Sequence, residues 1–382
     1  MIARQVRVDL SGGLRDYLAG DTIRDEALGP GLVLAGRRIE ALEPIRVAVI
    51  GCGNHSRGAL QPNLARLPHF DYVAACDLDE AAANDCARRF GARAAFTDYR
   101  RMLDEVRPEA VVVCGPPPLH LEAGLEVVGR GIHLFSEKPS APTVDGAEQL
   151  ARSADAAKVV GMVGFFWRHA EALHKLADLV AEPSFGAPLL YDGEYLSPGP
   201  RVAMWGAPSV AHSFLTDQAI HVIDATRFLM GEIAELTARS TEGPDGAAGY
   251  AVALRFASGA SGSLAVTSFT NAFTSRLVVH GSAGRSVEVI ENDLVRVLGG
   301  PALPRARGGY VDQNAVEWRQ GWTNAGHLRP GYVEELLTFA VAIREGIPVG
   351  ASLWDGVANM RVCGAIIDSV ASGRPATVEG LA

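Results

Sequence analysis

A glycine-containing turn near residue 50 has the residue types and spacing needed to hold a phosphate group. Gly51, Gly53 and Ser56 follow a run of apolar residues and open a segment compatible with a helix. In this context Gly51 permits a tight turn, Gly53 lets a pyrophosphate approach the backbone, and the helix N-terminus favours its negative charge. The third position is serine and not glycine, so the match to a dinucleotide fingerprint is imperfect. The residues expected to contact a cofactor here are Gly51, Gly53, Asn54, His55, Ser56 and Arg57.

Asp77 ends the next apolar run and could bind the ribose of the same dinucleotide. A carboxylate at this place accepts hydrogen bonds from the ribose hydroxyls, and its negative charge repels a 2′-phosphate. NAD is therefore the expected cofactor, and the nearby Arg57 leaves NADP open as a second possibility.

Two further polar segments directly follow predicted strands, at residues 115–120 and 136–139. Both would lie at the carboxyl ends of parallel strands, where the ligands of such sheets bind. We therefore expect further cofactor contacts from Gly115, Pro116, Pro117, His120, Glu137 and Lys138.

Taken together, these segments resemble the Gfo/Idh/MocA oxidoreductase family. The resemblance runs from about residue 46 to the C-terminus and includes residues 164–168 (Gly-Phe-Phe-Trp-Arg), 217–224 (Asp-Gln-Ala-Ile-His-Val-Ile-Asp) and 331–337 (Gly-Tyr-Val-Glu-Glu-Leu-Leu). It implies a Rossmann domain followed by an α/β domain whose open, mostly antiparallel sheet often packs between subunits. It also implies oxidation or reduction of a secondary alcohol on a sugar, cyclitol or related compound with NAD(P).

The resemblance places the family's catalytic residues at Lys138, Asp217 and His221. Hydride transfer from an alcohol carbon needs a base for the hydroxyl proton, and an imidazole that titrates near neutrality suits this task. Asp217 and His221 are four residues apart on one helical face, while Lys138 could stabilise negative charge on the reacting oxygen. Which of Lys138 and His221 exchanges the proton stays open, and we treat them as a coupled acid/base pair.

Substrate contacts are expected from the same three residues and from Arg168 and Tyr332. Arg168 could reach the cofactor or an acidic substrate, or it could form a structural ion pair. Asp224 is either a substrate contact or a helix-surface acid. The sequence also departs from the family at Ala219, where glycine is usual, and at Phe166, which makes this wall of the site more apolar.

The elements that must position these residues alternate between strands and helices in the first part of the chain. Such alternation predicts a doubly wound parallel sheet covered on both faces. The expected strands are residues 46–50, 71–76, 94–96, 110–114, 133–135 and 159–163, and the expected helices run from the glycine turn to residue 67 and over residues 79–90, 100–106, 119–130 and 144–156.

The pattern changes near residue 166, where longer strand-like runs joined by hairpin signals predict a mostly antiparallel sheet. The expected strands are residues 189–195, 233–239, 250–256, 261–268, 276–280 and 287–297, with helices at 171–179, 332–345 and 354–372. The chain is accordingly divided into an extension (1–44), a Rossmann domain (45–165) and an α/β domain for substrate and oligomer contacts (166–382). We expect a homodimer or homotetramer through the second sheet, and hypothesise that the extension locks this oligomer.

Composition excludes several classes of function. The chain of 382 residues carries 35 Lys and Arg against 44 Asp and Glu, a net charge of −9, so a nucleic-acid partner is not expected. Its apolar stretches fall short of the roughly 18 residues that span a bilayer, and its N-terminus lacks the apolar core of a signal peptide. Five cysteines without C-x-x-C spacing suggest a reduced, cytoplasmic protein. No metal site is expected, because Cys114, His169 and His174 lack the spacing of metal ligands.

Three alternatives to a sugar or polyol dehydrogenase stay open at this point. Some proteins of this family cleave glycosidic bonds by transient oxidation, some have become nucleotide-responsive regulators without catalysis, and a nucleotide-sugar ketoreductase is a narrower version of the main hypothesis. The presence of Lys138, Asp217 and His221 argues against the regulator.

Overall fold

The computed structural model describes residues 42–299, 316–319, 330–378 and 380, together with the backbone of 33–34 and 37–38, which form the short antiparallel pair β1 (Val33–Leu34) and β2 (Arg37–Arg38). The hypothesis about residues 1–44 therefore lies almost wholly outside the described residues. The chain divides into two compact units, Met1–His169 with Trp322–Val357, and Ala170–Gly321 with Ala358–Ala382. The described residues 330–357 are grouped with the first unit, and the sequence-based domain bounds stay a prediction.

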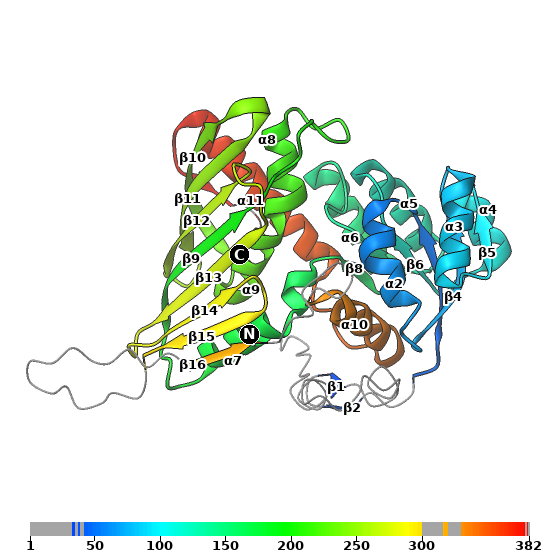
Figure 1. Ribbon diagram of the computed structural model, residues 1–382, viewed down its shortest axis with the longest axis horizontal. Coiled ribbons are helices and arrows are strands. Elements are labelled where there is room, and N and C mark those ends of the chain that lie inside the picture. The colour runs from blue at the N-terminus through cyan, green and yellow to red at the C-terminus, as the bar shows by residue number, and fades with distance from the viewer. Residues whose placement is uncertain are drawn as a thin grey trace, which may run out of the picture. The chain divides into compact units, whose positions relative to one another are not determined.

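The first unit is built on a six-stranded parallel sheet (Figure 1). Its order is β5 (Ala94–Phe96), β4 (Phe70–Cys76), β3 (Ile45–Ile50), β6 (Ala110–Val113), β7 (His133–Ser136) and β8 (Gly161–Val163). The chain runs outward from β3 in one direction and from β6 in the other, so right-handed crossovers place helices on both faces. The doubly wound prediction is confirmed, and its topological switch point lies between β3 and β6, where ligands of such sheets bind.

Three helices of this unit begin at residues whose side chains cap the first turn. The side chain of Asp79 accepts hydrogen bonds from the first turn of α3 (Glu80–Phe90), and Asp98 and Thr143 do the same for α4 (Tyr99–Val106) and α6 (Val144–Ala157). The helices are α2 (Gln61–Leu64), preceded by the π-helical turn η2 (Ser56–Leu60), then α3 (Glu80–Phe90), α4 (Tyr99–Val106), α5 (Pro117–Gly129), α6 (Val144–Ala157) and α10 (Tyr332–Glu345).

The second unit is built on a nine-stranded sheet whose neighbouring strands are antiparallel except for β9 and β12. This confirms the prediction of a large, mostly antiparallel sheet. The order is β16 (Val316–Arg319), β15 (Leu294–Leu298), β14 (Ser286–Ile290), β13 (Thr274–Gly281), β9 (Pro188–Leu196), β12 (Ser261–Thr267), β11 (Ala248–Phe256), β10 (Ile233–Glu242) and β17 (Ala376–Thr377).

The prediction of one strand over residues 287–297 is wrong, because the segment forms the two strands β14 and β15. They pair antiparallel, with Ile290 opposite Leu294. Between them Glu291 and Asn292 adopt left-handed backbone angles of φ 54° and 56°, which reverse the chain. The apolar alternation continues on both sides of this turn, so the pattern alone predicts one continuous strand.

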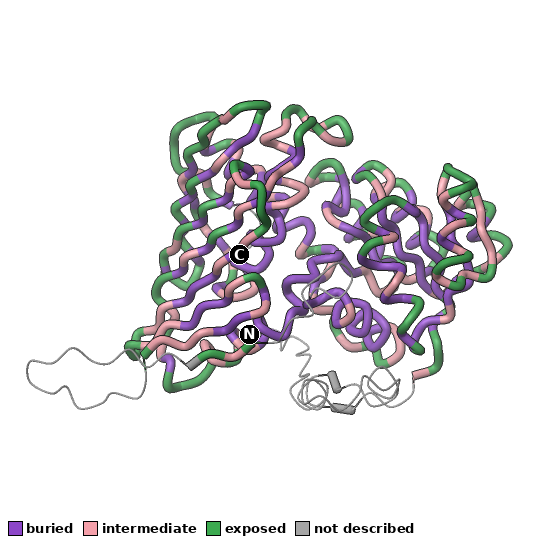
Figure 2. The backbone as a smooth tube through the Cα atoms, in the orientation of Figure 1, coloured by how far each residue is buried: buried purple, intermediate pink, exposed green. Residues whose placement is uncertain are grey.

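One face of the second sheet is covered by helices and the other is exposed. Tyr191 of β9 accepts a hydrogen bond from Thr226 (2.8 Å), and the backbone N–H of Ala238 in β10 donates to Ser369 (2.9 Å). The alternation of buried and exposed residues along β11 follows from this arrangement (Figure 2). The helices are α7 (Glu171–Ala181), α8 (Val210–Ser213), the π-helical η4 (Phe214–Ala219), α9 (Ile220–Met230) and α11 (Leu353–Ser372), which starts in the first unit and ends in the second.

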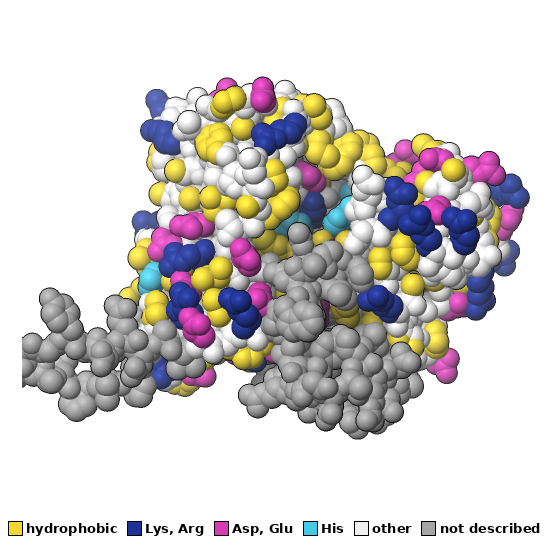
Figure 3. Space-filling model, viewed as in Figure 1, with side chains coloured by type: hydrophobic (Ala, Val, Ile, Leu, Met, Phe, Trp, Pro, Cys, Tyr) yellow, Lys and Arg dark blue, Asp and Glu magenta, His cyan; other side chains and the backbone are white. Residues whose placement is uncertain are grey.

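The charged side chains of the second unit are mixed in sign. Ion pairs join neighbouring strands of its sheet, including Arg276 with Glu288 (2.8 Å) and Arg296 with Glu317 (2.7 Å). Acidic and basic side chains are likewise interspersed on the face seen in Figure 3. Within the described residues, no helix has both the length and the apolar character to cross a bilayer.

Candidate active site

The glycine turn after β3 is formed as the sequence predicts, and its two glycines meet different surroundings. Gly51 has a left-handed φ of 99°, and a Cβ added there would lie 2.0 Å from the carbonyl oxygen of Cys114, at the end of β6. A Cβ on Gly53 would meet nothing within 4 Å. Gly51 therefore lets the turn pack on β6 at the switch point, whereas Gly53 leaves an open surface that a phosphate could approach.

Ser56, in the position where the fingerprint has its third glycine, is fully buried between helix and sheet. Its hydroxyl accepts a hydrogen bond from Gln61 (2.8 Å), and Gln61 in turn accepts one from Tyr72 of β4 (2.9 Å). Glycine normally allows helix and strand to approach closely at this position. Here a buried polar network occupies that contact, so the serine does not prevent the turn from forming.

Asp77 ties the glycine turn to the end of β4. Its two carboxylate oxygens accept the backbone N–H groups of Cys52 (2.7 Å) and Asp79 (2.9 Å). A carboxylate offers about four acceptor positions, so capacity remains for ribose hydroxyls. Arg57, which left NADP open, donates to Asn54 (3.0 Å) in the first turn of the helix.

The segment after β6 is joined to the segment after β7 through His120, which is buried in α5. The N–H of Gly115 donates to Nε2 of His120 (2.9 Å), so the neutral ring carries its proton on Nδ1 and donates it to the carbonyl of Pro139 (2.7 Å). The N-terminus of α5 is set by Pro116 and Pro117. His120 therefore positions both segments, and its predicted cofactor contact stays a prediction.

Glu137 links the lysine segment to the glycine turn. One carboxylate oxygen contacts Nε2 of His55 (3.1 Å), and the other accepts the backbone N–H of Lys138 (3.1 Å). The carboxylate fits because Gly164 has no side chain: a Cβ there would lie 2.9 Å from Oε1 of Glu137. Lys138 itself is partly exposed, and its peptide bond to Pro139 is cis.

Arg168 is placed by the short helix η3 (Phe166–His169) and forms a buried ion pair. Its side chain is only 3% exposed, and its guanidinium lies 2.9 Å from a carboxylate oxygen of Asp355 and donates to the carbonyl of Gly350 (3.0 Å). These contacts favour the structural alternative for Arg168. Sequence reasoning missed Asp355, although Ser352 three residues earlier forms a capping arrangement with it that could have been recognised.

An aromatic stack borders the glycine turn. The rings of Phe166 and Tyr332 lie parallel with centroids 4.1 Å apart, and Tyr332 is 6.0 Å from the ring of His55. The apolar wall that Phe166 led us to expect is therefore present within the first unit, and Tyr332 forms part of it.

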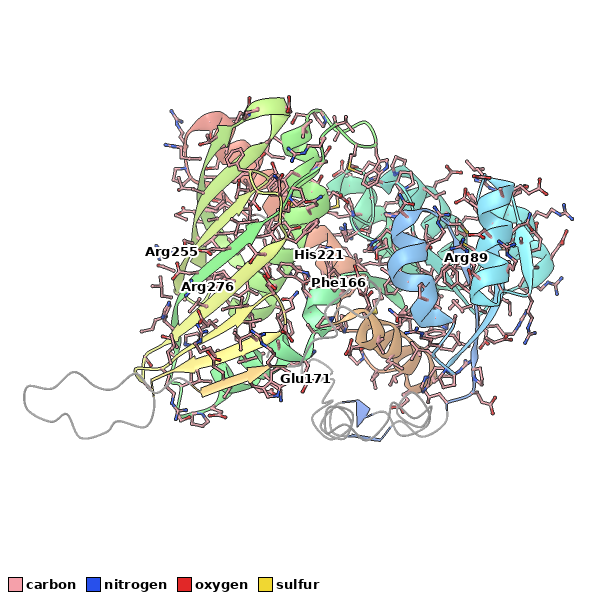
Figure 4. All side chains as sticks on the ribbon, viewed as in Figure 1. Arg89, Phe166, Glu171, His221, Arg255 and Arg276 are labelled. Atoms are coloured by element: carbon pink, nitrogen blue, oxygen red, sulfur yellow. The ribbon has the colours of Figure 1, made fainter. Side chains whose placement is uncertain are left out.

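In the second unit, Asp217 lies in η4. His221, which Figure 4 labels, lies in the first turn of α9. His221 is buried and Asp217 is partly exposed. Ala219, where the family usually has glycine, is fully buried in the same turn. Lys138 belongs to the other unit, so a single catalytic set of Lys138, Asp217 and His221 stays a prediction.

Asp224 is not a helix-surface acid, because it is fully buried on α9. It accepts a hydrogen bond from the amide of Asn359 on α11 (2.7 Å), whose oxygen accepts one from Arg227 (2.8 Å). Such a satisfied buried network fixes the packing of two helices.

The five cysteines are free and buried. Burial raises the pKa of Cys76 and of Cys363 to about 12, so their thiols stay protonated at neutral pH. Among the residues that the structure describes, no group of three or more metal-binding side chains gathers.

Comparison with known families identifies both units. A family profile described as "Oxidoreductase family, NAD-binding Rossmann fold" matches residues 45–165, and one described as "GFO/IDH/MocA C-terminal domain" matches residues 173–287. The first match covers the glycine turn, Asp77 and Lys138, and the second covers Asp217 and His221.

Individual proteins with similarity over most of the chain are named as dehydrogenases. An inositol 2-dehydrogenase of Rubrobacter xylanophilus is 31% identical over 89% of this chain and 94% of its own length. A levoglucosan dehydrogenase of Pseudarthrobacter phenanthrenivorans is 28% identical over 76% and 85%. The crystal structure of a dehydrogenase from Chromobacterium violaceum superposes with a TM-score of 0.80, at 28% identity, over 87% of this chain and 97% of that one.

Proposed function

Because the chain belongs to the Gfo/Idh/MocA oxidoreductase family, we propose that it transfers a hydride between NAD and a secondary alcohol or ketone of a sugar, cyclitol or sugar derivative. The chain is an NAD-dependent dehydrogenase. The class of substrate and the roles of individual residues are what we propose beyond this.

The observation that carries the proposal is the connection from the glycine turn to Lys138. His55 follows the turn and contacts Glu137, which accepts the backbone N–H of Lys138. The surface that suits a pyrophosphate and the lysine suited to the reacting oxygen are therefore joined at one edge of the parallel sheet. A dinucleotide dehydrogenase needs both features together, because the same cofactor must be anchored and must present its reactive ring to the substrate.

The residues of the first unit fit NAD. Gly53 leaves an open surface, the helix N-terminus favours the pyrophosphate, and Asp77 retains acceptor capacity for the ribose. Asp77 would also repel a 2′-phosphate, which favours NAD over NADP. When bound, NAD supplies the acceptor or donor of the hydride.

The protein's own part in the reaction is to hold the alcohol and to move its proton. We assign Lys138 to the reacting oxygen, where its ammonium group stabilises developing negative charge. Either His221 or Lys138 takes up the hydroxyl proton during oxidation and returns it during reduction, and Asp217 orients the imidazole or contacts substrate. Lys138 and His221 act as one coupled pair.

The substrate class is suggested by the relatives and by the aromatic stack. Two relatives are named for inositol and levoglucosan, which are ring compounds with several hydroxyl groups. The stacked rings of Phe166 and Tyr332 offer an apolar surface beside His55, against which the C–H face of such a ring could pack.

We also propose that the chain forms a homodimer or homotetramer through the exposed face of its second sheet. Small side chains occupy the middle of this face, where Ala251 and Ala265 lie opposite each other on β11 and β12 and both are exposed. A flat, exposed sheet face of this kind can pack against the same face of a second copy.

The test of the catalytic roles uses the purified full chain and three variants. NADH and NADPH binding is followed by fluorescence, and polyols and sugars are screened for oxidation. We expect Lys138→Ala and His221→Ala to keep NADH affinity within a few-fold and to lose roughly 10²- to 10⁴-fold in kcat, the range for a positioned acid or base. His280→Ala, on the exposed sheet, is the matched histidine control and should keep its activity.

Failure of both nucleotides to bind would contradict the proposal outright. Release of an aglycone from a glycoside without net NADH formation would instead favour the redox-assisted glycosidase. Nucleotide binding without any turnover across the screen would favour the regulator.

A further inference from the structure

Glu335 on α10 is a buried acid whose surroundings are unusual. It is fully buried, and no donor among the described residues gives a hydrogen bond to either of its carboxyl oxygens. Its neighbour Glu334 caps the helix, because its carboxylate accepts the N–H of Gly331 (2.9 Å). Glu335 points inward and takes no part in the cap, so its presence in the core calls for a different explanation.

The register of α10 against β7 places Glu335 beside Glu137. Phe339, one helical turn after Glu335, packs edge-on against Phe135 of β7 with ring centroids 5.8 Å apart. Glu137 follows directly after β7, and Tyr332 at the start of α10 lies 6.0 Å from the ring of His55, which contacts Glu137, so the first turn of the helix lies at this end of the strand. Burial raises the pKa of Glu335 well above its usual range, and the charges of Glu137 and Glu334 raise it further.

Two buried carboxylates side by side cannot both be ionised without a large cost. Glu137 has the partners of a charged group, because it accepts the N–H of Lys138 and contacts His55, whose side chain is 44% exposed. On η3, which also packs against α10, Arg168 is paired with Asp355 and His169 contacts Thr338 (3.4 Å). The helix α2 also packs against α10, and its buried polar side chains, Gln61 and Asn63, do not titrate. The proton therefore belongs on Glu335 and the charge on Glu137.

We propose that Glu335 is held as a neutral carboxylic acid and forms with Glu137 a one-proton pair that fixes a single negative charge behind Lys138. Glu335 is a positioning residue and acts through Glu137. A second carboxylate here would favour the charged form of Lys138 and would compete for His55. Without Glu335, the carboxylate of Glu137 would lose a neighbouring donor that helps to hold it against Lys138. The last step, from the pair to catalysis, rests on the proposed function of Lys138.

The location of the proton can be tested without any substrate, by comparing the pH dependence of stability of the wild-type chain and Glu335→Gln. If Glu335 is neutral, the folded chain keeps a proton that the unfolded chain releases above about pH 4.3. The wild type then loses stability as the pH rises, while glutamine, which is neutral at every pH, avoids this loss. The unfolding equilibrium constants should diverge by up to about tenfold per pH unit between pH 5 and pH 7, with the variant the more stable at the higher pH.

The matched control is Glu334→Gln, which removes the neighbouring helix-capping carboxylate. Its stability difference from the wild type should not grow in favour of the variant over this range. A difference for Glu335→Gln that stays constant from pH 5 to pH 7 would mean that Glu335 is ionised in the folded chain, and the proposal would be overturned.

Infrared spectroscopy gives a second readout on the wild-type chain itself. A protonated carboxyl group should show its carbonyl band at neutral pH, and the band should shift in D2O. We expect the band to be absent from Glu335→Gln and present in Glu334→Gln. Its absence from the wild type would contradict the proposal even if the variants failed to fold.

The positioning role is tested by turnover of Glu335→Leu, which has no polar group, against Glu335→Gln. The leucine variant should lose at least roughly tenfold more kcat than the glutamine variant and should show an altered pH profile, while both bind NADH. Equal turnover and unchanged pH profiles in both variants would remove the positioning role. Because the stability and infrared tests need no substrate, an error in the proposed substrate class cannot be mistaken for an error here.

Discussion

At the scale of single residues, Gly51 and Gly53 serve one turn for different reasons. Gly51 is required by the fold, because its backbone is left-handed and a Cβ would collide with the carbonyl of Cys114. Gly53 has no left-handed backbone angle, and a Cβ there would meet no atom of the protein within 4 Å. Any need for glycine at Gly53 must therefore come from a ligand that approaches the backbone.

Gly51→Ala should accordingly lower the free energy of unfolding by more than the roughly 1–3 kcal/mol of backbone strain, since a carbonyl must also move. Gly53→Ala should change stability by no more than about 0.5 kcal/mol, as expected away from packed sites. It should nevertheless weaken NADH binding by about tenfold, because its methyl group occupies the surface meant for the pyrophosphate. Thermal unfolding and fluorescence titration measure the two effects. If Gly53→Ala binds NADH like the wild type, the turn is not the phosphate site.

At the scale of elements, the sequence predicts best where a strand is buried on both sides. All six strands of the parallel sheet lie where continuous apolar runs indicated, and residues 94–96 match β5 at both ends. The hairpin between β14 and β15 was missed because apolar alternation continues through a turn that depends on the backbone angles of Glu291 and Asn292. The π-helical turns η2 and η4 leave no trace in the apolar pattern.

The candidate site could be predicted to the extent that its residues follow strands in the sequence. Gly51, Asp77 and Glu137 lie at the ends of β3, β4 and β7, so the topology alone brings them to one edge of the sheet. The partner of Arg168 could not be predicted, because Asp355 comes from a distant helix and meets Arg168 only after folding. The same is true of Glu335, whose role depends on the register of a helix against a strand.

The contact between η3 and the start of α11 yields a prediction about these two elements. Asp355 both caps α11 and neutralises the buried Arg168, so Asp355→Ala should cost about 3 kcal/mol, the low end for a broken buried pair, because Asp355 is 22% exposed. Ser352→Ala removes only part of the cap and should cost about 1 kcal/mol. Denaturant unfolding measures both costs.

The same experiment decides the role of Arg168. If its ion pair is structural, Arg168→Gln should lower stability while the NADH dissociation constant stays within about twofold, a change of under 0.5 kcal/mol. A large rise in the NADH dissociation constant of Arg168→Gln, with little loss of stability, would mean that Arg168 contacts the cofactor.

At the scale of the whole molecule, the exposed face of the second sheet is the feature that a single chain leaves unexplained. Its strands are long, their middle positions carry small side chains such as Ala251, Ala253 and Ala265, and the opposite face is already covered by helices. An uncovered sheet face of this extent either stays in solvent or packs against another surface. Small side chains allow a second sheet to approach closely. They are also apolar, so they gain nothing from contact with water.

Ala253→Arg should therefore reduce the mass of the particle in solution, because it places a long charged side chain in the middle of the proposed interface, beside Arg255 on the same face. Asn84→Arg, on an exposed position of α3 in the other unit, adds the same charge away from the sheet and should leave the mass unchanged. Light scattering after size-exclusion chromatography measures both. If the wild-type chain has the mass of one copy, or if Ala253→Arg keeps the wild-type mass, copies do not assemble through this face. If only Ala253→Arg falls to a smaller particle and it still binds NADH, the cofactor site of the first unit is complete without the second copy.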